Sequence, residues 1–470
     1  MKKLFTLSLF TFTFSLFTPM CNAQIVDLHD FADTGSVGNT NTKFPISTLT
    51  LSGNVLYGTT EEGGPSGEGQ IYSIHVDGTG FKDLLDFNGT NGGAPFGQLI
   101  LIGKNLYGCS EEGGANFMGN IFRIDTNGNG FTDLYDFARA TGGVPSSSLF
   151  LSGGKFFGAT FQYGPGDSGV VFSVDTNGAN YKVLHGCSGP DGNHPSGGVT
   201  VVGNKVYALC QDGGTNHYGT LFTVDSTGNN YKSLINFTGA NGANPDYSHV
   251  TCVNKTLWGM TYNGGVYNQG CIFSVDTDGT NEKTRVSLKD SIGSYPHNSF
   301  MLLGKRLIGM ITNGGVNGDG YIVAIDTDGT NLTDLADFDG INGREPLSDL
   351  ILSGDVFYGV TWEGGSKVDG NVFSFTYTGL GIQQLSVANG KCSVYPNPSS
   401  GMFTVQSSVG SGQWSVEVYN VLGEKIYSTH SLTTNHCSLD LSSSPSGVYL
   451  YRVVANSGEL IGEGKLVIQK

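Results

Sequence analysis

The fold is decided by residues 95–145, PFGQLILIGKNLYGCSEEGGANFMGNIFRIDTNGNGFTDLYDFARATGGVP, because this stretch is one copy of a unit that recurs along the chain. Seven copies fill residues 45–379. A Gly-Gly pair recurs in six of them, and Tyr163-Gly164 takes its place in the third copy. The copies follow at steps of 50 or 51 residues, as one proline in each shows: Pro45, Pro95, Pro145, Pro195, Pro245, Pro296 and Pro346.

The second copy predicts four short strands, at residues 98–102, 105–110, 120–125 and 131–137. Each is bounded by turn residues, and no segment shows the helical spacing of apolar residues. Four strands in each of seven copies predict an all-β chain folded as a seven-bladed β-propeller. A parallel β-helix is the alternative, although its coils are shorter and rarely carry four strands.

The two ends of the repeat region predict a closed ring. The third strand of the last copy ends near Tyr377, and no fourth strand follows it. The segment IVDLHDF at residues 25–31 matches the fourth strands FKDLLDF at 81–87 and LTDLADF at 332–338. We therefore expect the N-terminal segment to complete the seventh blade as its outer strand, which would remove an open sheet edge.

Composition agrees with short strands and many turns. The chain has 73 glycines among 470 residues, about twice the usual ~7%. Of these, 61 lie in residues 45–379, where they mark turns and bends. The net charge of −16 argues against nucleic acid or an anionic membrane surface as a partner.

The N-terminus predicts export. Lys2 and Lys3 precede an apolar run at residues 4–17, and small residues end at Ala23, as in a signal peptide of residues 1–23. A lipoprotein acylated at Cys21 is the alternative. No later apolar run approaches the ~20 residues of a membrane-spanning helix.

The cysteines predict neither a disulfide framework nor a zinc site. Seven remain after the expected cleavage, and no CxxC pair occurs among them. Most replace core residues, as Cys187 does where another copy has Phe87. Cys392 and Cys437 could form a pair near the C-terminus. We expect no metal and no cofactor.

Two stretches carry a resemblance to a known repeat. LYGTTEEGG at residues 56–64 and IFSVDTDGTN at 272–281 resemble the Gloeobacter/Verrucomicrobia-type (GloVer) tandem repeats of exported bacterial proteins. The resemblance covers most of residues 24–379, and it implies no activity. The unit is also loosely similar to kelch repeats.

After an expected linker at residues 380–391, the composition changes. VYPNP at 394–398, VEVYNVLG at 416–423 and KLVIQK at 465–470 resemble the type A C-terminal sorting domain of the type IX secretion system. That resemblance implies an Ig-like β-sandwich at residues 392–470, contact with the secretion machinery, and a secreted or outer-membrane surface location. An ordinary Ig-like binding module is the alternative.

The two residues directly before each Gly-Gly pair form the candidate ligand site. These loops leave strand two and should share one face with the loops that leave strand four. The later residue of the two is acidic or amide in all seven copies, which predicts a side chain that accepts loop N–H groups. The earlier residue varies, as an asymmetric site requires, and its mixture of aromatic and polar side chains suits a sugar. We therefore expect ligand contacts from Glu61, Glu111, Phe161, Gln211, Tyr262 and Trp362.

The sequence favours a binding protein for a glycan or a protein over an enzyme, because no catalytic motif occurs in it. The carboxylates of Glu61, Glu62, Glu111 and Glu112 leave open a polysaccharide hydrolase or lyase. A structural or adhesion protein without a pocket is a further alternative. Asp-Gly turns such as residues 276–279 are expected as hairpin turns and not as calcium loops, because their Gly comes too early for an EF-hand.

Overall fold

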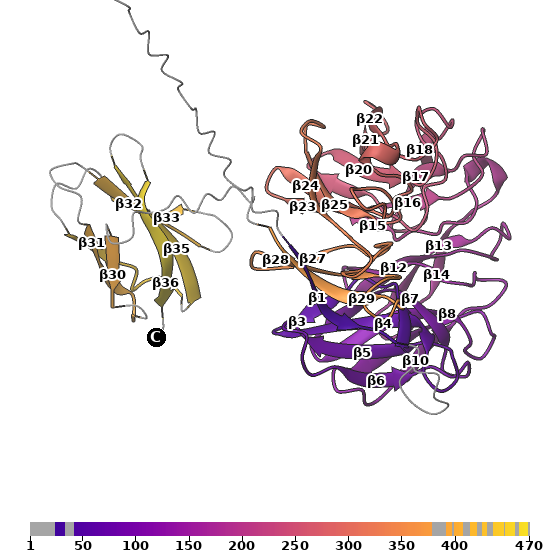
Figure 1. Cartoon of the computed structure of the whole chain (residues 1–470), viewed down its shortest axis with the longest axis horizontal. Helices are drawn as coiled ribbons and strands as arrows, with labels where there is room; N and C mark the ends of the chain where they lie inside the picture. Colours follow the sequence, from indigo (N-terminus) through magenta and orange to yellow (C-terminus); the bar gives the residue numbers. More distant parts are fainter. Residues whose placement is uncertain are drawn as a thin grey trace, which may run out of the picture. The chain divides into compact units, whose positions relative to one another are not determined.

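The computed structural model (Figure 1) divides into two compact units, Met1–Tyr377 and Thr378–Lys470. It describes residues 24–32, 42–377, 392–396, 399–407, 414–420, 425–429, 436–445, 447–455 and 460–468. The expected signal peptide and linker lie outside these described residues. Apart from two short 3-10 turns, Gly189–Asp191 and Asp290–Ile292, all regular elements of the described part are strands.

In its described residues, the larger unit contains seven separate antiparallel sheets. Consecutive strands form six of them, and in the seventh the N-terminal strand joins the last three strands of the unit. The first sheet is β2 (Thr42–Pro45), β3 (Thr50–Ser52), β4 (Val55–Gly63), β5 (Gln70–His75) and β6 (Lys82–Asp86). The other six are β7 (Gly93–Ile102), β8 (Asn105–Glu112), β9 (Asn120–Asp125) and β10 (Thr132–Asp136); β11 (Phe150–Ser152), β12 (Lys155–Thr160), β13 (Val170–Asp175) and β14 (Lys182–Gly186); β15 (Thr200–Val202), β16 (Lys205–Cys210), β17 (Thr220–Asp225) and β18 (Lys232–Asn236); β19 (Thr251–Val253), β20 (Thr256–Thr261), β21 (Cys271–Asp276) and β22 (Lys283–Ser287); β23 (Met301–Leu303), β24 (Arg306–Ile311), β25 (Tyr321–Asp326) and β26 (Thr333–Asp337); and β27 (Ile351–Ser353), β28 (Val356–Thr361), β29 (Asn371–Thr376) and β1 (Ile25–Asp30).

Neighbouring sheets pack face to face through their middle strands. Ile71 of β5 and Leu106 of β8 are fully buried in one apolar cluster with Phe122 of β9. Because the middle strands are covered on both faces, nearly all of their residues are buried. Turns such as that closed by Gly128, with φ +88°, join the third and fourth strands as the sequence predicts.

The predicted closure by the N-terminal segment is confirmed, because β1 pairs with β29 from Ile25↔Phe375 to Asp30↔Asn371. Figure 1 shows the indigo β1 beside the orange β29. Phe31 then packs between the first sheet and the last, in a cluster with Tyr72 and Tyr358. This ring of stacked sheets is a β-propeller.

The repeated prolines and glycines join each sheet to the next. A Cβ added at Gly119 would lie 2.7 Å from Cδ of Pro145, and one at Gly370 would lie 2.7 Å from Cδ of Pro45. The residue before each proline has a positive φ of 46–58°, and its N–H donates to a loop carbonyl of the preceding repeat: Phe44, Ala94, Val144, His194, Asn244, Tyr295 and Glu345. A left-handed backbone is unusual for such residues, so these contacts between repeats hold it in place.

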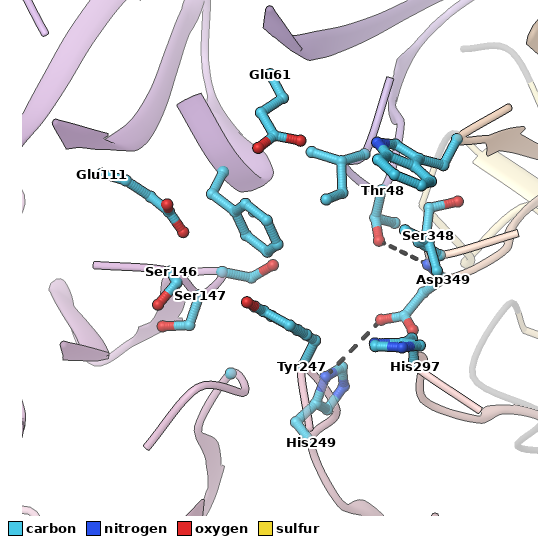
Figure 2. A pocket seen from close by; sticks show the side chains of 17 residues that line it. Thr48, Glu61, Glu111, Ser146, Ser147, Tyr247, His249, His297, Ser348 and Asp349 are labelled. Atoms are coloured by element: carbon cyan, nitrogen blue, oxygen red, sulfur yellow. Dashed lines mark hydrogen bonds and ion pairs between the residues drawn. The ribbon is translucent and has the colours of Figure 1, made fainter. Parts of the chain in front are cut away.

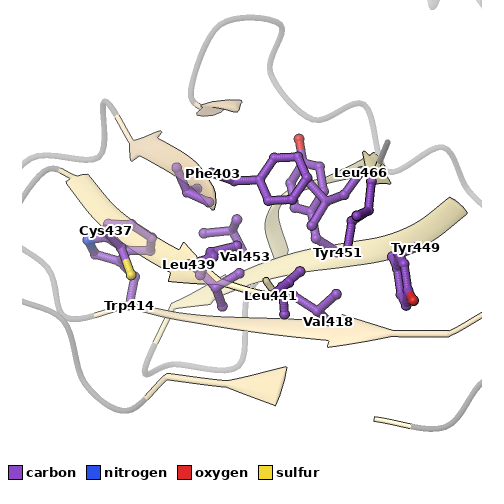
Figure 3. Close-up of a cluster of buried hydrophobic side chains, with 13 residues drawn as sticks. Phe403, Trp414, Val418, Cys437, Leu439, Leu441, Tyr449, Tyr451, Val453 and Leu466 are labelled. Atoms are coloured by element: carbon purple, nitrogen blue, oxygen red, sulfur yellow. The ribbon is translucent and has the colours of Figure 1, made fainter. Parts of the chain in front are cut away.

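The smaller unit has two sheets that face one apolar core (Figure 3). Phe403 and Leu439 approach this core from one sheet, and Val418 and Val453 approach it from the other. One sheet is β30 (Cys392–Tyr395), β31 (Met402–Ser407) and β34 (His436–Asp440); the other is β33 (Lys425–Ser428), β32 (Trp414–Tyr419), β35 (Gly447–Ala455) and β36 (Leu460–Ile468).

The possible pairing of Cys392 with Cys437 is wrong, because Cys437 is a free thiol in the structure. The two residues lie on β30 and β34, which flank β31 on opposite sides. Two strand spacings amount to roughly 10 Å. A disulfide needs its two Cα atoms within about 7 Å.

Candidate functional site

A pocket of about 230 Å³ lies among the sheets of the larger unit, and residues from all seven repeats line it (Figure 2). Two segments of the repeat supply them: the chain just after the repeated proline and the end of the second strand. None of the lining residues is a lysine or an arginine. The lining consists of the carboxylates Glu61, Glu111 and Asp349, the rings of Phe96, Tyr247, Trp362, His249 and His297, the hydroxyls Thr48, Ser146, Ser147, Ser148 and Ser348, and Ile46, Gly97, Gly198 and Leu347.

Glu61 and Glu111 lie on strands and not in the loops where the sequence places them. β4 continues to Gly63 and β8 to Glu112, whereas the second strands of the other sheets end before the equivalent residue. In β4 and β8 the pairing with the preceding segment belongs to the strand itself, as between Gly93 and Glu112. In the other repeats the same pairing is an isolated bridge, such as Gly143↔Gln162. Successive strand residues point to opposite faces, so Glu61 and Glu111 face the pocket while Glu112 is exposed.

Burial raises the pKa of Glu111 to about 8, and the nearby charges of Glu61 and Glu112 add to the shift. The pKa of Glu61 is also raised, first by burial and then by Glu62, although the nearby indole of Trp362 opposes the rise. Both shifts mean that desolvation and like charge penalise the ionised form. The pocket therefore holds carboxyl groups whose charge its own residues do not balance.

A chain of hydrogen bonds crosses between repeats on one side of the pocket. The Asp349 N–H donates to Oγ1 of Thr48 over 2.9 Å, which joins the last repeat to the first. The Ser299 N–H donates to Oδ1 of Asp349, and the His249 N–H donates to Oγ of Ser299 over 2.8 Å. The dashed lines in Figure 2 mark the contacts of Asp349 with Thr48 and His249. These contacts fix the position of Asp349 and partly offset the charge of its carboxylate.

His297 is a neutral group in the pocket wall, because burial lowers its pKa to about 4. Its ring lies 5.7 Å from that of Tyr247 and 4.6 Å from that of Tyr262, measured between ring centroids. The phenol of Tyr247 has a raised pKa, caused mainly by burial and also by Asp246, Glu111 and Glu61. Tyr247 and His297 therefore add no positive charge to the pocket at neutral pH.

The structure brings three of the six candidate residues together. Glu61, Glu111 and Trp362 line the pocket. Phe161, Gln211 and Tyr262 are not among its lining residues. Phe161 instead stacks on His194 at 4.7 Å, and Tyr262 packs against His297, which does line the pocket.

The lining residues that follow the repeated proline were missed in the sequence analysis. They include Thr48, Tyr247, His249, His297 and Asp349. A usable signal exists, because the third position after the proline varies among Thr, Gln, Ser, Gly and Asp in six copies while the position after it is apolar in all six.

The side chains directly before the Gly-Gly pairs make other contacts than those predicted for them. Glu62 forms an ion pair with Lys43 at 2.8 Å, and Arg344 donates to Glu363. Asn244 donates to Oδ1 of Asp212 over 3.1 Å. These partners are side chains from the segment before the repeated proline and not loop N–H groups. This position therefore ties the two segments that shape the pocket.

We expect Glu111→Gln to stabilise the protein increasingly as pH rises from 4.5 to about 8. The fold holds a proton on Glu111 with a pKa of about 8, whereas the unfolded chain releases it near the ordinary value of 4.5. Ionisation in this window therefore favours unfolding, and glutamine removes that loss. Thermal unfolding across the window measures it. The difference should level off above about pH 8, and Glu112→Gln is the exposed control. A difference between Glu111→Gln and wild type that stays constant with pH would contradict the assignment.

Comparison with known proteins identifies both parts of the chain. The Gloeobacter/Verrucomicrobia repeat matches residues 17–222 and 202–411. The chain belongs to the Gloeobacter/Verrucomicrobia repeat family. A secretion system C-terminal sorting domain matches residues 393–469 of this repeat protein. The sorting domain indicates export by the type IX secretion system.

Solved structures similar to this repeat protein include an oligogalacturonate lyase in complex with manganese, at 13% identity and a TM-score of 0.45 over 75% of this chain and 93% of that one. A puromycin-hydrolyzing peptidase of Mycobacterium tuberculosis matches at 11% identity and a TM-score of 0.46. The match covers 77% of this repeat protein and 57% of the peptidase. The β-propeller domain of the Trilobed protease from Pyrococcus furiosus matches at 8% identity and a TM-score of 0.43, over 71% and 96% of the two chains. No curated relative matches the repeat protein. Among its described residues there is no helix long and apolar enough to cross a membrane.

Proposed function

We propose that this repeat protein is a glycan-binding protein of the cell exterior. In this proposal, residues 24–379 form a seven-bladed β-propeller, and residues 392–470 form an Ig-like sorting domain after a linker at 380–391. A signal peptide of residues 1–23 is removed, and the protein is secreted or held at the outer-membrane surface. The seven sheets and their closure by β1 support the blade count.

The observation that carries the glycan proposal is the composition of the central pocket. Phe96, Tyr247 and Trp362 offer aromatic faces, and a sugar ring stacks on such faces. Carboxylates and hydroxyls such as Glu61 and Ser147 lie in the same wall and can bond sugar hydroxyls. A protein ligand is less favoured, because a pocket of about 230 Å³ suits a small group better than a broad surface.

We expect Trp362→Ala to weaken binding of the cognate glycan at least tenfold, which is about 1.4 kcal/mol. A buried aromatic contact at the centre of a site commonly contributes this much. A glycan array identifies the ligand, and titration calorimetry measures its affinity. Phe161→Ala is the matched control, since Phe161 holds the equivalent position in the third repeat but does not line the pocket. An array without any bound glycan would overturn the proposal.

A polysaccharide-active enzyme is the second candidate, and the coupled carboxyls favour it. A group with a pKa of about 8, Glu111, lies within electrostatic reach of Glu61. General acid–base cleavage of a glycosidic bond needs one protonated and one ionised carboxyl group. The test is release of reducing ends from the bound glycan. Turnover by the wild type that disappears in Glu111→Gln would establish the enzyme, and binding without turnover would exclude it.

A further inference from the structure

We propose that the central pocket selects sugars that carry a free ammonium group, namely hexosamines without an N-acetyl group. The inference rests on the proposed glycan-binding function and makes it narrower. It is carried by the sign of the charge around the pocket and by the aromatic side chains in the same wall.

The pocket has acidic side chains that no basic residue of its lining balances. Glu61, Glu111 and Asp349 line it, whereas no lysine or arginine does. His297 is neutral at neutral pH, because burial lowers its pKa to about 4. Nδ1 of His249 lies 3.8 Å from Oδ2 of Asp349, so any positive charge on this ring would pair with Asp349. Glu61 and Glu111 remain without a cation in the lining.

Two basic side chains from the segments before the repeated prolines form ion pairs with other carboxylates. Lys43 pairs with Glu62, and Arg344 pairs with Glu363, both at the position directly after the pocket-facing residue of their repeats. Within the part of the chain that the structure describes, no ion pair joins Glu61 or Glu111 to a basic residue. The raised pKa of Glu111 agrees with this, because burial and Glu61 both oppose its ionisation. A bound cation would reverse that penalty.

The geometry favours an organic cation over a metal ion. Among the described residues, no group of three or more histidine, cysteine, aspartate and glutamate side chains could hold a metal. The carboxylates instead share the pocket lining with the aromatic rings of Phe96, Tyr247 and Trp362. Aromatic faces attract ammonium groups through their quadrupole.

A sugar is a better carrier of this ammonium group than a peptide side chain. Ser146, Ser147, Ser148 and Thr48 line the same small volume and offer hydroxyl partners. An aminated sugar ring uses the aromatic faces, the hydroxyls and the carboxylates together. A neutral sugar, including an N-acetylated one, would contact the aromatic faces and the hydroxyls but would leave the carboxylates without a cation.

The test compares oligosaccharides of glucosamine and of N-acetylglucosamine with the same length and linkage, so that only the amine differs. Calorimetry on the full chain at about pH 6, where the glucosamine amine is protonated more fully because its pKa lies well below that of lysine, should show at least tenfold tighter binding of the glucosamine oligomer. In the double variant Glu61→Gln, Glu111→Gln this ratio should fall toward one. Glu112→Gln is the matched control, because it removes an adjacent exposed carboxylate and should keep the ratio.

Each other outcome is decisive. Equal or tighter binding of the N-acetylated oligomer overturns the amine preference and leaves the glycan function in place. Absence of binding to both oligomers and to every other glycan overturns both proposals. A ratio that is unchanged in the double variant would trace the preference to the overall charge of −16 and overturn the pocket assignment. Equally tight binding of a lysine oligomer would show that no sugar ring is required.

Discussion

We expect Phe31→Ala to lower the free energy of unfolding of the larger unit by about 3–5 kcal/mol, the usual cost of removing a buried phenylalanine side chain. Phe31 is completely buried at the junction between the first and last sheets. Its ring lies 5.1 Å from that of Tyr72 and packs in the same cluster as Val360. Because Phe31 directly follows β1, the cavity would also loosen the strand that closes the ring.

Denaturant unfolding of the full chain measures this loss, with the transition of the larger unit followed by limited proteolysis or near-UV dichroism. Val26→Ala is the control on the same strand, because Val26 is 49% exposed and should change stability by no more than about 0.5 kcal/mol. If the two variants lost equal stability, or if Phe31→Ala lost less than about 1 kcal/mol, closure by the N-terminal segment would not be a major source of stability.

The second large effect is on export. We expect a chain that ends at residue 391 to remain inside the cell envelope, with none at the surface or in the medium. The sorting domain matched at residues 393–469 is the part that indicates type IX export. Its core is built from residues between Val394 and Ile468, so its removal leaves the apolar clusters of the larger unit complete. Cell fractionation and surface proteolysis in a host with type IX secretion measure the outcome.

The control separates a sorting defect from a folding defect. The truncated chain should keep the far-UV spectrum of a β protein and its glycan affinity after purification. Ile426→Ala changes an exposed side chain of β33, outside the stretches that resemble the sorting domain, and should be exported normally. Truncated protein at the cell surface would show that export information lies elsewhere in the chain.

The strands of the larger unit were predictable because antiparallel strands that are neighbours in sequence pair with each other. In the second repeat the sequence predicts strands at 98–102, 105–110, 120–125 and 131–137, and the structure has β7 at 93–102, β8 at 105–112, β9 at 120–125 and β10 at 132–136. The differences fall where β7 and β8 pair beyond the hairpin, from Pro95↔Ser110 to Gly93↔Glu112. That extra pairing depends on how the chain enters the repeat, and no local pattern shows it.

The candidate site was predictable only in part. Glu61, Glu111 and Trp362 were found because variation at one repeat position was compared across copies. Which copies face the pocket could not be found in this way, because Phe161 and Tyr262 hold the same repeat position and yet do not line it. Tyr247 and His297 were missed, because their environment comes from other repeats.

By itself, the sequence determined the repeat, its strands and turns, the outer strand at the N-terminus and the sorting domain at the C-terminus. These features depend on local spacing, turn chemistry and pairing between successive segments, all of which are visible along one chain. Only the tertiary structure decided the pocket and its charge, because residues as distant as Thr48 and Asp349 meet there. It also decided the left-handed backbone of Phe44 and Val144, which contacts between repeats impose against the local preference of those residues.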